Sequence, residues 1–202
     1  MSEEVVKLGQ NVPDFELNTY DPAEAKFGVF KLADQIARKR WTILFFYPAD
    51  FTFVCATEFA ALAEQHEGFL KLGCDVVTVS TDTQFVHLAW QQSEGELANV
   101  RYPMAADRTG KVSRLFGVYD ENTGLALRGA FIIDPKGVLL NSEVNFYNLG
   151  RNIDELMRKF KANLYMSTNP AEVCPAKWKD KGDKTLKPSE ALVGKVHEAL
   201  AG

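Results

Sequence analysis

Stretches dominated by apolar residues alternate along the chain with stretches in which apolar residues recur every three or four positions. Residues 41–47 (WTILFFY) and 74–80 (CDVVTVS) are too short for helices and rich in strand-forming residues, so they predict two buried β-strands. Between them, residues 55–72 carry apolar positions at helical spacing and stop at Gly73, a common helix terminator. A second helix is expected over 84–92. Strands and helices in this order predict a βαβ unit with parallel strands.

The second half of the chain predicts antiparallel strands and a long helix. Residues 125–133 form a predicted strand, the turn 134–137 reverses the chain, and 138–146 supply the antiparallel partner. An apolar stripe at helical spacing predicts an amphipathic helix over 152–166. We therefore expect an α/β fold in which helices flank a central mixed sheet. Shorter elements are expected as a strand at 12–17 and helices at 32–40 and 109–116.

The character of the chain changes at residue 169. Prolines, Gly182 and six lysines make the remainder polar and extended. We therefore predict a domain over 1–168 and a C-terminal arm over 169–202. Because the arm carries one cysteine and one tryptophan, Cys174 and Trp178, we expect it to dock on another surface.

Composition narrows the class of protein. The chain has 202 residues, 46% of them hydrophobic, and a formal charge of −4, which is ordinary globular usage. Mild acidity argues against nucleic acid as a partner, and the longest clean apolar run, 43–47, is far shorter than a membrane span. The acidic N-terminal segment lacks an apolar signal region, and three cysteines are too few for a disulfide scaffold. We therefore expect a cytoplasmic protein.

The most informative stretch is 46–55, FYPADFTFVC. A buried strand delivers the chain to Pro48, and after a short loop Cys55 stands at the start of a long helix. Backbone N–H groups and the helix dipole stabilise a thiolate at that position, and the thiolate is the nucleophilic form. Thr52 supplies a hydroxyl that can donate to the sulfur or accept from a substrate, and Pro48 can shield the sulfur from water.

The other cysteines have different surroundings. Cys74 opens a buried strand and is expected to pack in the core, whereas Cys174 lies in the arm, where another thiol can reach it. The absence of a Cys-x-x-Cys pair argues against a zinc site and against a thioredoxin-type disulfide reductase. No metal or cofactor is therefore expected.

Several segments resemble the peroxiredoxins, and within them the bacterial alkyl hydroperoxide reductase C-subunit group of typical two-cysteine enzymes. The resemblance covers roughly residues 5–198, and its first and last segments are the most specific. The matching segments are 46–55, 78–82 (TVSTD), 87–90 (HLAW), 127–134 (LRGAFIID) and 172–178 (EVCPAKW).

The resemblance implies a thioredoxin-like fold and a role for each matching residue. Cys55 matches the peroxidatic cysteine, and Cys174 matches the resolving cysteine, which the partner subunit contributes in this group. Pro48 and Thr52 match substrate-pocket residues. Arg128 matches an arginine that faces the thiolate, and Glu58 matches a glutamate that orients this arginine.

The implied function is a thiol-dependent peroxidase that reduces hydrogen peroxide and organic hydroperoxides. Peroxide oxidises Cys55 to a sulfenic acid, which condenses with Cys174 to an intersubunit disulfide. Because two sulfurs must approach to about 2.05 Å, we expect the first helical turn after Cys55 to unwind in the oxidised form. The implied partners are a second copy of the chain, often in a ring of five dimers, and thioredoxin or a flavoprotein disulfide reductase as electron donor.

The chain departs from the resembled pattern in two places. Ala56 stands where the family usually has proline, which is expected to loosen the first helical turn slightly. The segment 95–97 lacks the GGLG insertion of readily overoxidised relatives, and the chain ends without their terminal Tyr-Phe. By resemblance, the protein should resist oxidation to sulfinic acid.

Two other functional classes stay open at this point. In a Cys–His hydrolase, His66 is excluded as the base, because 11 residues of helix place it about 16 Å from Cys55. His87 and His197 are not excluded, although each is expected to be an ordinary surface or half-buried histidine. The second class is a non-catalytic redox sensor or chaperone-like module. Aromatic residues at 45–47, 51 and 53 could serve an oligomer interface, although those at 45–47 lie in the predicted strand and are placed for burial in the core.

Overall fold

The computed structural model describes residues 4–201. Residues 1–3, at the start of the predicted domain, and residue 202, at the end of the predicted arm, lie outside the described residues. The chain forms two compact units, the first ending at Ile153 and the second beginning at Asp154. Within residues 4–201, no helix combines the length and apolar character needed to cross a membrane.

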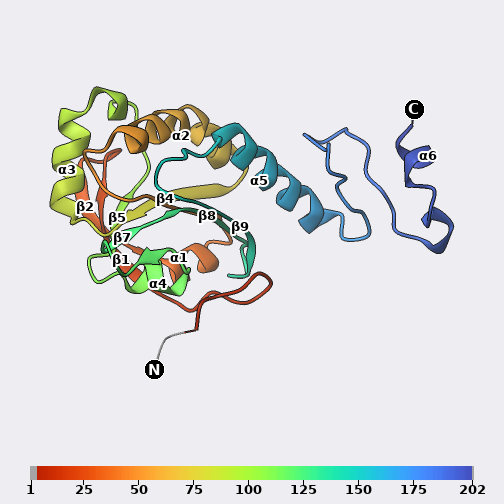
Figure 1. The fold of residues 1–202 in the computed structure, drawn as a ribbon, viewed down its shortest axis with the longest axis horizontal. Coiled ribbons are helices and arrows are strands. Elements are labelled where there is room, and N and C mark those ends of the chain that lie inside the picture. Colours follow the sequence, from red (N-terminus) through yellow and green to blue (C-terminus); the bar gives the residue numbers. More distant parts are fainter. Residues whose placement is uncertain (1–3, 202) are drawn as a thin grey trace. The chain divides into compact units, whose positions relative to one another are not determined.

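The first unit is built on a seven-stranded mixed sheet with the strand order β2-β1-β5-β4-β3-β8-β9 (Figure 1). β3 pairs in parallel with β4, and β4 with β5, whereas β8 lies antiparallel on the other side of β3. Two short strands, β6 and β7, form a separate hairpin. The strands are β1 (Glu16–Asp21), β2 (Lys26–Lys31), β3 (Trp41–Phe46), β4 (Cys74–Ser80), β5 (Met104–Ala106), β6 (Tyr119–Asp120), β7 (Leu125–Ala126), β8 (Arg128–Ile133) and β9 (Leu139–Asn145).

Helices cover both faces of this sheet (Figure 1). The helical elements are α1 (Leu32–Ala37), α2 (Phe53–Lys71), α3 (Gln84–Ser93), α4 (Lys111–Leu115), α5 (Ile153–Thr168) and α6 (Val196–Leu200), with 3-10 turns η1 (Gly95–Leu97) and η2 (Glu190–Leu192). Side chains alternate along β3, so Leu44 and Phe46 join the core formed with α1 and α4. On the side of α2, Phe59 packs against Tyr47, Trp90 and Tyr102. Every residue of β3 is buried, as its unbroken apolar run predicts.

The predicted βαβ unit is confirmed, because β3, α2, β4 and α3 follow in order and the two strands are parallel. The antiparallel pairing of β8 with β9 is also confirmed. The connectivity of the central sheet therefore rests on elements whose periodicity is strong in the sequence. The fold is α/β, a mixed sheet flanked by helices, as expected.

Several elements differ from the prediction. The strand expected over 125–133 is divided at Leu127, whose N–H bonds to the carbonyl of Val118 while the N–H of Gly129 bonds back to Leu127. The first strand begins at Glu16 rather than at residue 12, because Pro13 has no N–H to donate to a ladder. Strands β2 and β5 were not predicted, since β2 is largely exposed and β5 has only three residues.

The second unit contains most of α5 and the arm. Arg158 on α5 donates to the carbonyl of Trp178 at 2.9 Å, and the rings of Tyr165 and Trp178 lie 5.7 Å apart. Lys161 forms an ion pair with Asp180. Trp178 is 2% exposed, so the arm docks on α5 within its own unit through this side chain.

Candidate functional site

Cys55 is held by a loop that joins the buried strand β3 to helix α2. Pro48 is buried just after the strand, and Thr52 caps the helix in an extended conformation, so that Cys55 is the third helical residue. The first helical N–H groups have no partners within the helix and point toward this end. Phe51 adopts a positive φ of 58°, which is unusual for a bulky residue and marks strain in the loop.

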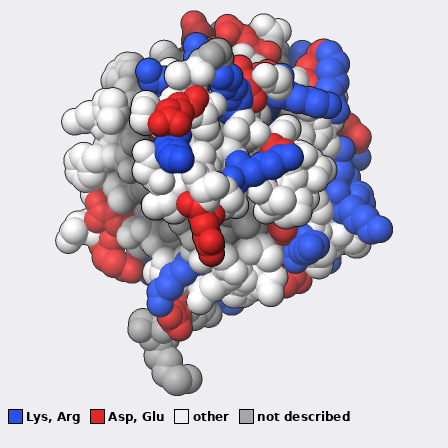
Figure 2. Space-filling model, turned by 90° about the vertical axis from the view of Figure 1, so that its right-hand side faces the viewer, with Lys and Arg blue, Asp and Glu red and all other residues white. Residues whose placement is uncertain are grey.

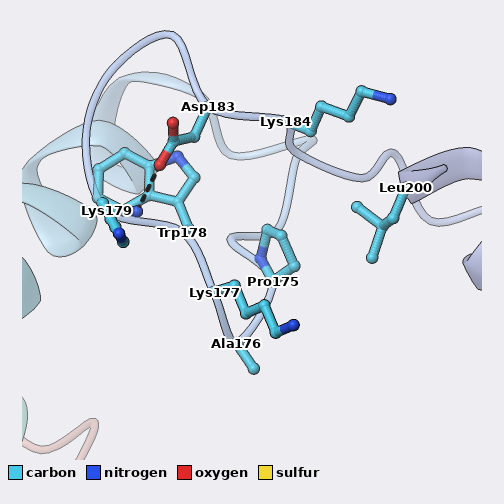
Figure 3. A pocket seen from close by; sticks show the side chains of 8 residues that line it. All are labelled: Pro175, Ala176, Lys177, Trp178, Lys179, Asp183, Lys184 and Leu200. Atoms are coloured by element: carbon cyan, nitrogen blue, oxygen red, sulfur yellow. Dashed lines mark hydrogen bonds between the residues drawn. The ribbon is translucent and has the colours of Figure 1, made fainter. Parts of the chain in front are cut away.

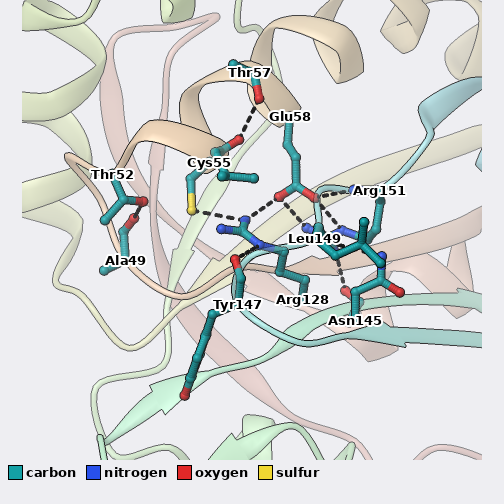
Figure 4. Close-up of polar contacts among 12 residues, drawn as sticks. Ala49, Thr52, Cys55, Thr57, Glu58, Arg128, Asn145, Tyr147, Leu149 and Arg151 are labelled. Atoms are coloured by element: carbon teal, nitrogen blue, oxygen red, sulfur yellow. Dashed lines mark hydrogen bonds and ion pairs between the residues drawn. The ribbon is translucent and has the colours of Figure 1, made fainter.

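The Arg128 guanidinium points toward the Cys55 sulfur (Figure 4). Its Nη1 donates to Cys55 Sγ at 3.3 Å, and the two residues lie 73 positions apart. The antiparallel pairing of Phe45 with Ala130 brings the start of β8 to the end of β3, from which the chain continues to Cys55. Both side chains are buried, so the guanidinium acts on the sulfur with little screening by water.

Glu58 stands one helical turn after Cys55 and holds Arg128 in place. The carboxylate accepts from Arg128 Nη1 at 2.7 Å and from the backbone and side chain of Arg151 at 2.8–2.9 Å. Burial raises the pKa of Glu58, but the hydrogen bonds and charge of Arg151 outweigh it, with Arg128 adding to them, and the pKa is lowered. The same Arg128 nitrogen therefore bridges the sulfur and a carboxylate that stays ionised.

Sequence reasoning missed Arg151. This side chain is 1% exposed, donates to the carbonyl of Gly129 at 2.7 Å, and stacks 3.3 Å above the ring of Phe45. Burial lowers its pKa, opposed by Glu58. A cation two residues before a helix start opposes the helix dipole, and this was the one sequence signal that the residue has another partner.

The structure places Thr52 and Pro48 in the same loop. The Thr52 hydroxyl donates to the carbonyl of Ala49 at 2.8 Å, so its proton is directed there and not at the sulfur. The oxygen keeps lone pairs with which it can accept from a bound molecule. Thr52 is partly exposed whereas Pro48 and Cys55 are buried, so the hydroxyl lies nearer to solvent than the sulfur.

A second buried polar cluster holds the loop between β3 and α2 in place. Asp50 accepts from the Tyr47 hydroxyl at 2.6 Å and contacts His87 Nδ1 at 2.7 Å, while its N–H donates to Asp82 at 2.9 Å. Burial raises the pKa of Asp50, opposed by His87. The expectation that His87 is a surface or half-buried histidine is wrong, because its side chain is fully buried in this cluster. The cluster ties the loop to α3.

The three cysteines occupy different environments, and none of them is in a disulfide. Cys74 is fully buried in β4, and burial, with the charge of Asp75, raises its pKa well above the usual value. This thiol is therefore unreactive at neutral pH, as expected of a core residue. Among residues 4–201, no group of three or more His, Cys, Asp or Glu side chains is arranged to hold a metal ion.

Cys174 lies in the second unit and is partly exposed. Its neighbour Val173 pairs with Leu186, and Glu172 accepts from the hydroxyls of Tyr165 at 2.8 Å and Thr185 at 2.5 Å. Partial burial raises the pKa of Cys174, opposed by Arg158. The Cys174 thiol is thus accessible, and the residues just before it are held by contacts with nearby parts of the same unit.

Residues of the arm line a pocket of about 640 Å³, and the first of them in the sequence, Pro175, directly follows Cys174 (Figure 3). Its lining combines apolar side chains with three lysines and one aspartate, so the charge of the lining is mainly positive. The lining residues are Pro175, Ala176, Lys177, Trp178, Lys179, Asp183, Lys184 and Leu200.

Comparison with known proteins identifies the class. A buried cysteine at a helix start that faces an ion-paired arginine has the surroundings of a reactive thiol. The model of the AhpC/TSA family matches residues 8–142, and the chain belongs to this family as a typical two-cysteine peroxiredoxin of the alkyl hydroperoxide reductase C group. It is therefore a thiol-dependent peroxidase.

Individual relatives support this assignment over most of the chain. Alkyl hydroperoxide reductase C of Staphylococcus saprophyticus is 42% identical over 94% of this chain and 98% of its own. The Escherichia coli K12 protein of the same name is 46% identical over 82% of this chain and 88% of its own. The structure of reduced 2-Cys peroxiredoxin from Plasmodium vivax matches with a TM-score of 0.85 and 31% identity, over 91% of this chain and 94% of that one.

Proposed function

We propose that Cys55 is the peroxidatic cysteine and that Arg128 is its electrostatic partner. The observation that carries the proposal is the contact of Arg128 Nη1 with Cys55 Sγ at 3.3 Å, braced by Glu58 at 2.7 Å. A guanidinium stays charged and presents several donors, so it can stabilise both the thiolate and an oxygen that gains charge. Glu58 is then a positioning residue for Arg128.

The reaction follows from these roles. The Cys55 thiolate attacks one oxygen of the peroxide, the O–O bond breaks, and its electron pair stays on the leaving oxygen, which takes up a proton and departs as water or an alcohol. Cys55 becomes a sulfenic acid. The Arg128 guanidinium can donate to the oxygen that gains charge, a lone pair of Thr52 can accept from the O–H of the hydroperoxide, and buried Pro48 limits access of water.

Resolution falls to Cys174 in the arm 169–202, which we assign as separate in role from the peroxidase domain 1–168. The Cys174 thiol attacks the sulfenic sulfur, a disulfide forms, and the hydroxyl group leaves as water. Cys55 is fully buried, which supports the expectation that the first turn of α2 unwinds before the two sulfurs meet. Greater hydrogen exchange at residues 54–58 in the disulfide form than in the reduced form would test this unwinding.

An external dithiol then reduces the disulfide and leaves as a disulfide itself, which completes the electron balance. Thioredoxin or a flavoprotein disulfide reductase is the inferred donor. The segment 174–187 carries five lysines and two aspartates, and one face of the molecule bears many Lys and Arg side chains with acidic ones between them (Figure 2). The net positive charge of the segment 174–187 favours a donor with an acidic docking face. Hydrogen peroxide and organic hydroperoxides are the inferred substrates.

We infer that the protein acts as a homodimer, and that dimers assemble into a ring of five. Strand β9 is an edge of the sheet, and Val144 and Phe146 are 46% and 67% exposed at its end. Phe51 and Phe53 are 58% and 93% exposed on the loop before Cys55. Large apolar groups left in water support contacts between subunits. A cytoplasmic location is inferred from three unpaired thiols.

Non-reducing gel electrophoresis after one equivalent of peroxide tests the cysteine assignments. The wild type and a Cys74→Ser control should form a covalent dimer, whereas Cys55→Ser and Cys174→Ser should remain monomeric. Peroxide turnover with a supplied dithiol should be lost in Cys55→Ser. A covalent dimer that persists in Cys174→Ser, or turnover that persists in Cys55→Ser, would refute the corresponding role.

A further inference from the structure

The loop 146–152 between β9 and α5 contacts the candidate site near each of its ends (Figure 4). The carbonyl of Tyr147 accepts from Arg128 Nε at 2.7 Å, and the N–H of Arg151 donates to Glu58. The buried Arg151 side chain holds the far end of the loop, whereas Phe146 and Leu149 are 67% and 63% exposed. Around Tyr147 itself, few buried contacts therefore hold the carbonyl that accepts from Arg128 Nε.

The Tyr147 side chain supplies an anchor. Its hydroxyl donates to Asp120 Oδ2 at 2.8 Å, and because a phenol has one proton, the 2.8 Å contact with Thr123 must run from the threonine hydroxyl to the phenol oxygen. Thr123 Oγ1 in turn accepts from the N–H of Leu125 at 3.3 Å. These groups form one directed chain of hydrogen bonds across the β6–β7 hairpin, in which each bond polarises the next.

The β6–β7 hairpin, at the far end of this chain of hydrogen bonds, is itself held by hydrogen bonds. Asp120 Oδ1 accepts from the N–H of Asn122 at 2.9 Å, and the Asp120 carbonyl accepts from the N–H of Gly124 at 2.8 Å. The hydrogen bond from Tyr147 is the main cause of a lowered pKa of Asp120, so the acceptor stays ionised at neutral pH. The anchor therefore joins a closed turn to the loop that carries the Tyr147 carbonyl.

We propose that Tyr147, held by Asp120 and Thr123, is a positioning residue that fixes the Arg128 guanidinium for peroxide cleavage. The proposal rests on the roles assigned above to Cys55 and Arg128. Arg128 uses Nε toward the Tyr147 carbonyl and Nη1 toward both the sulfur and Glu58, so its planar fork is set by contacts on two sides. Without the phenol hydroxyl, the Tyr147 carbonyl is no longer held in place, and Arg128 can shift with it. A guanidinium N–H displaced by about 1 Å stabilises the developing oxyanion much less well.

The test compares two electrophiles on the same thiol. In Tyr147→Phe, the rate of Cys55 oxidation by hydrogen peroxide should fall about fivefold to twentyfold, while alkylation by iodoacetamide should change less than about twofold. Alkylation needs the thiolate but places no charge on an oxygen that Arg128 must hold. Tyr20→Phe is the matched control, because its hydroxyl bonds to Gln91 at 3.3 Å and contacts none of these groups. Asp120→Asn should show a smaller peroxide-specific loss.

The same measurements identify the route of the effect. In an Arg128→Lys background, which lacks Nε, adding Tyr147→Phe should cause no further loss if Tyr147 acts through this arginine. A peroxide rate within twofold of wild type, an equal loss with both electrophiles, or a full additional loss in the Lys background would each overturn the proposal. Full peroxide activity in Arg128→Lys alone would instead reject the role assigned to Arg128.

Discussion

The surroundings of Cys55 and of Cys174 differ in how far their charged groups are buried. Around Cys55, a carboxylate and two guanidinium groups are almost wholly removed from water and saturate one another with hydrogen bonds. Around Cys174, Glu172 and Arg158 make contacts of similar length at the surface. Buried ion pairs hold a fixed geometry at a high desolvation cost, whereas surface pairs are readily exchanged for water. The Cys55 thiol, which we propose as the nucleophile, thus lies in a preset site, and the Cys174 thiol lies in a segment that can be released.

The largest expected difference between the regions is in stability. Arg151→Met removes the two side-chain hydrogen bonds to buried Glu58, but not the one from the backbone N–H of residue 151, and should lower the free energy of unfolding by about 3–5 kcal/mol. The N–H contact itself belongs to the backbone and is lost only if the loop moves. Arg158→Met removes a partly exposed pair with Glu155 and should cost about 0–1 kcal/mol. Urea unfolding of both variants measures this, and equal losses would remove the distinction.

The pH dependence of stability gives a sharper test of the buried network. The pKa of Glu58 is lowered below its usual 4.5 in the folded state, so ionised Glu58 stabilises the fold above about pH 4.5, and this contribution is lost as the pH falls through the folded value. The stability advantage of wild type over Glu58→Gln should therefore shrink between pH 6 and pH 3. Denaturant unfolding at several pH values measures it. An advantage that stays constant over this range would mean that the ionised form is not preferred by the fold.

The smallest expected effect concerns the arm. Tyr165→Phe removes one hydrogen bond to Glu172, two residues before Cys174, and should speed disulfide formation by up to about fivefold by loosening the segment. The preceding oxidation of Cys55 should be unchanged. Acid-quenched samples on non-reducing gels time the disulfide, and stopped-flow fluorescence times the oxidation. A slower peroxide step in this variant would show that the two regions are not separable in function.

Local sequence features predicted much of the fold. The apolar run of β3, the helical spacing of α2 and the short links between them identified the parallel unit, because these signals depend only on which face each residue must bury. Strand β5 escaped prediction because three residues carry no periodicity. His87 was misjudged because its burial depends on Asp50, a partner 37 positions away.

The sequence by itself determined where Cys55, the proposed nucleophile, stands: after a buried strand, at the first turn of a helix, beside Thr52. Family resemblance added Arg128 and Glu58 as candidates. Only the tertiary structure brought in Arg151 and Tyr147, which reach the site from a loop that follows the last strand. The physical reason is that local propensity is set by neighbours along the chain, whereas charge compensation in a buried site is set by neighbours in space.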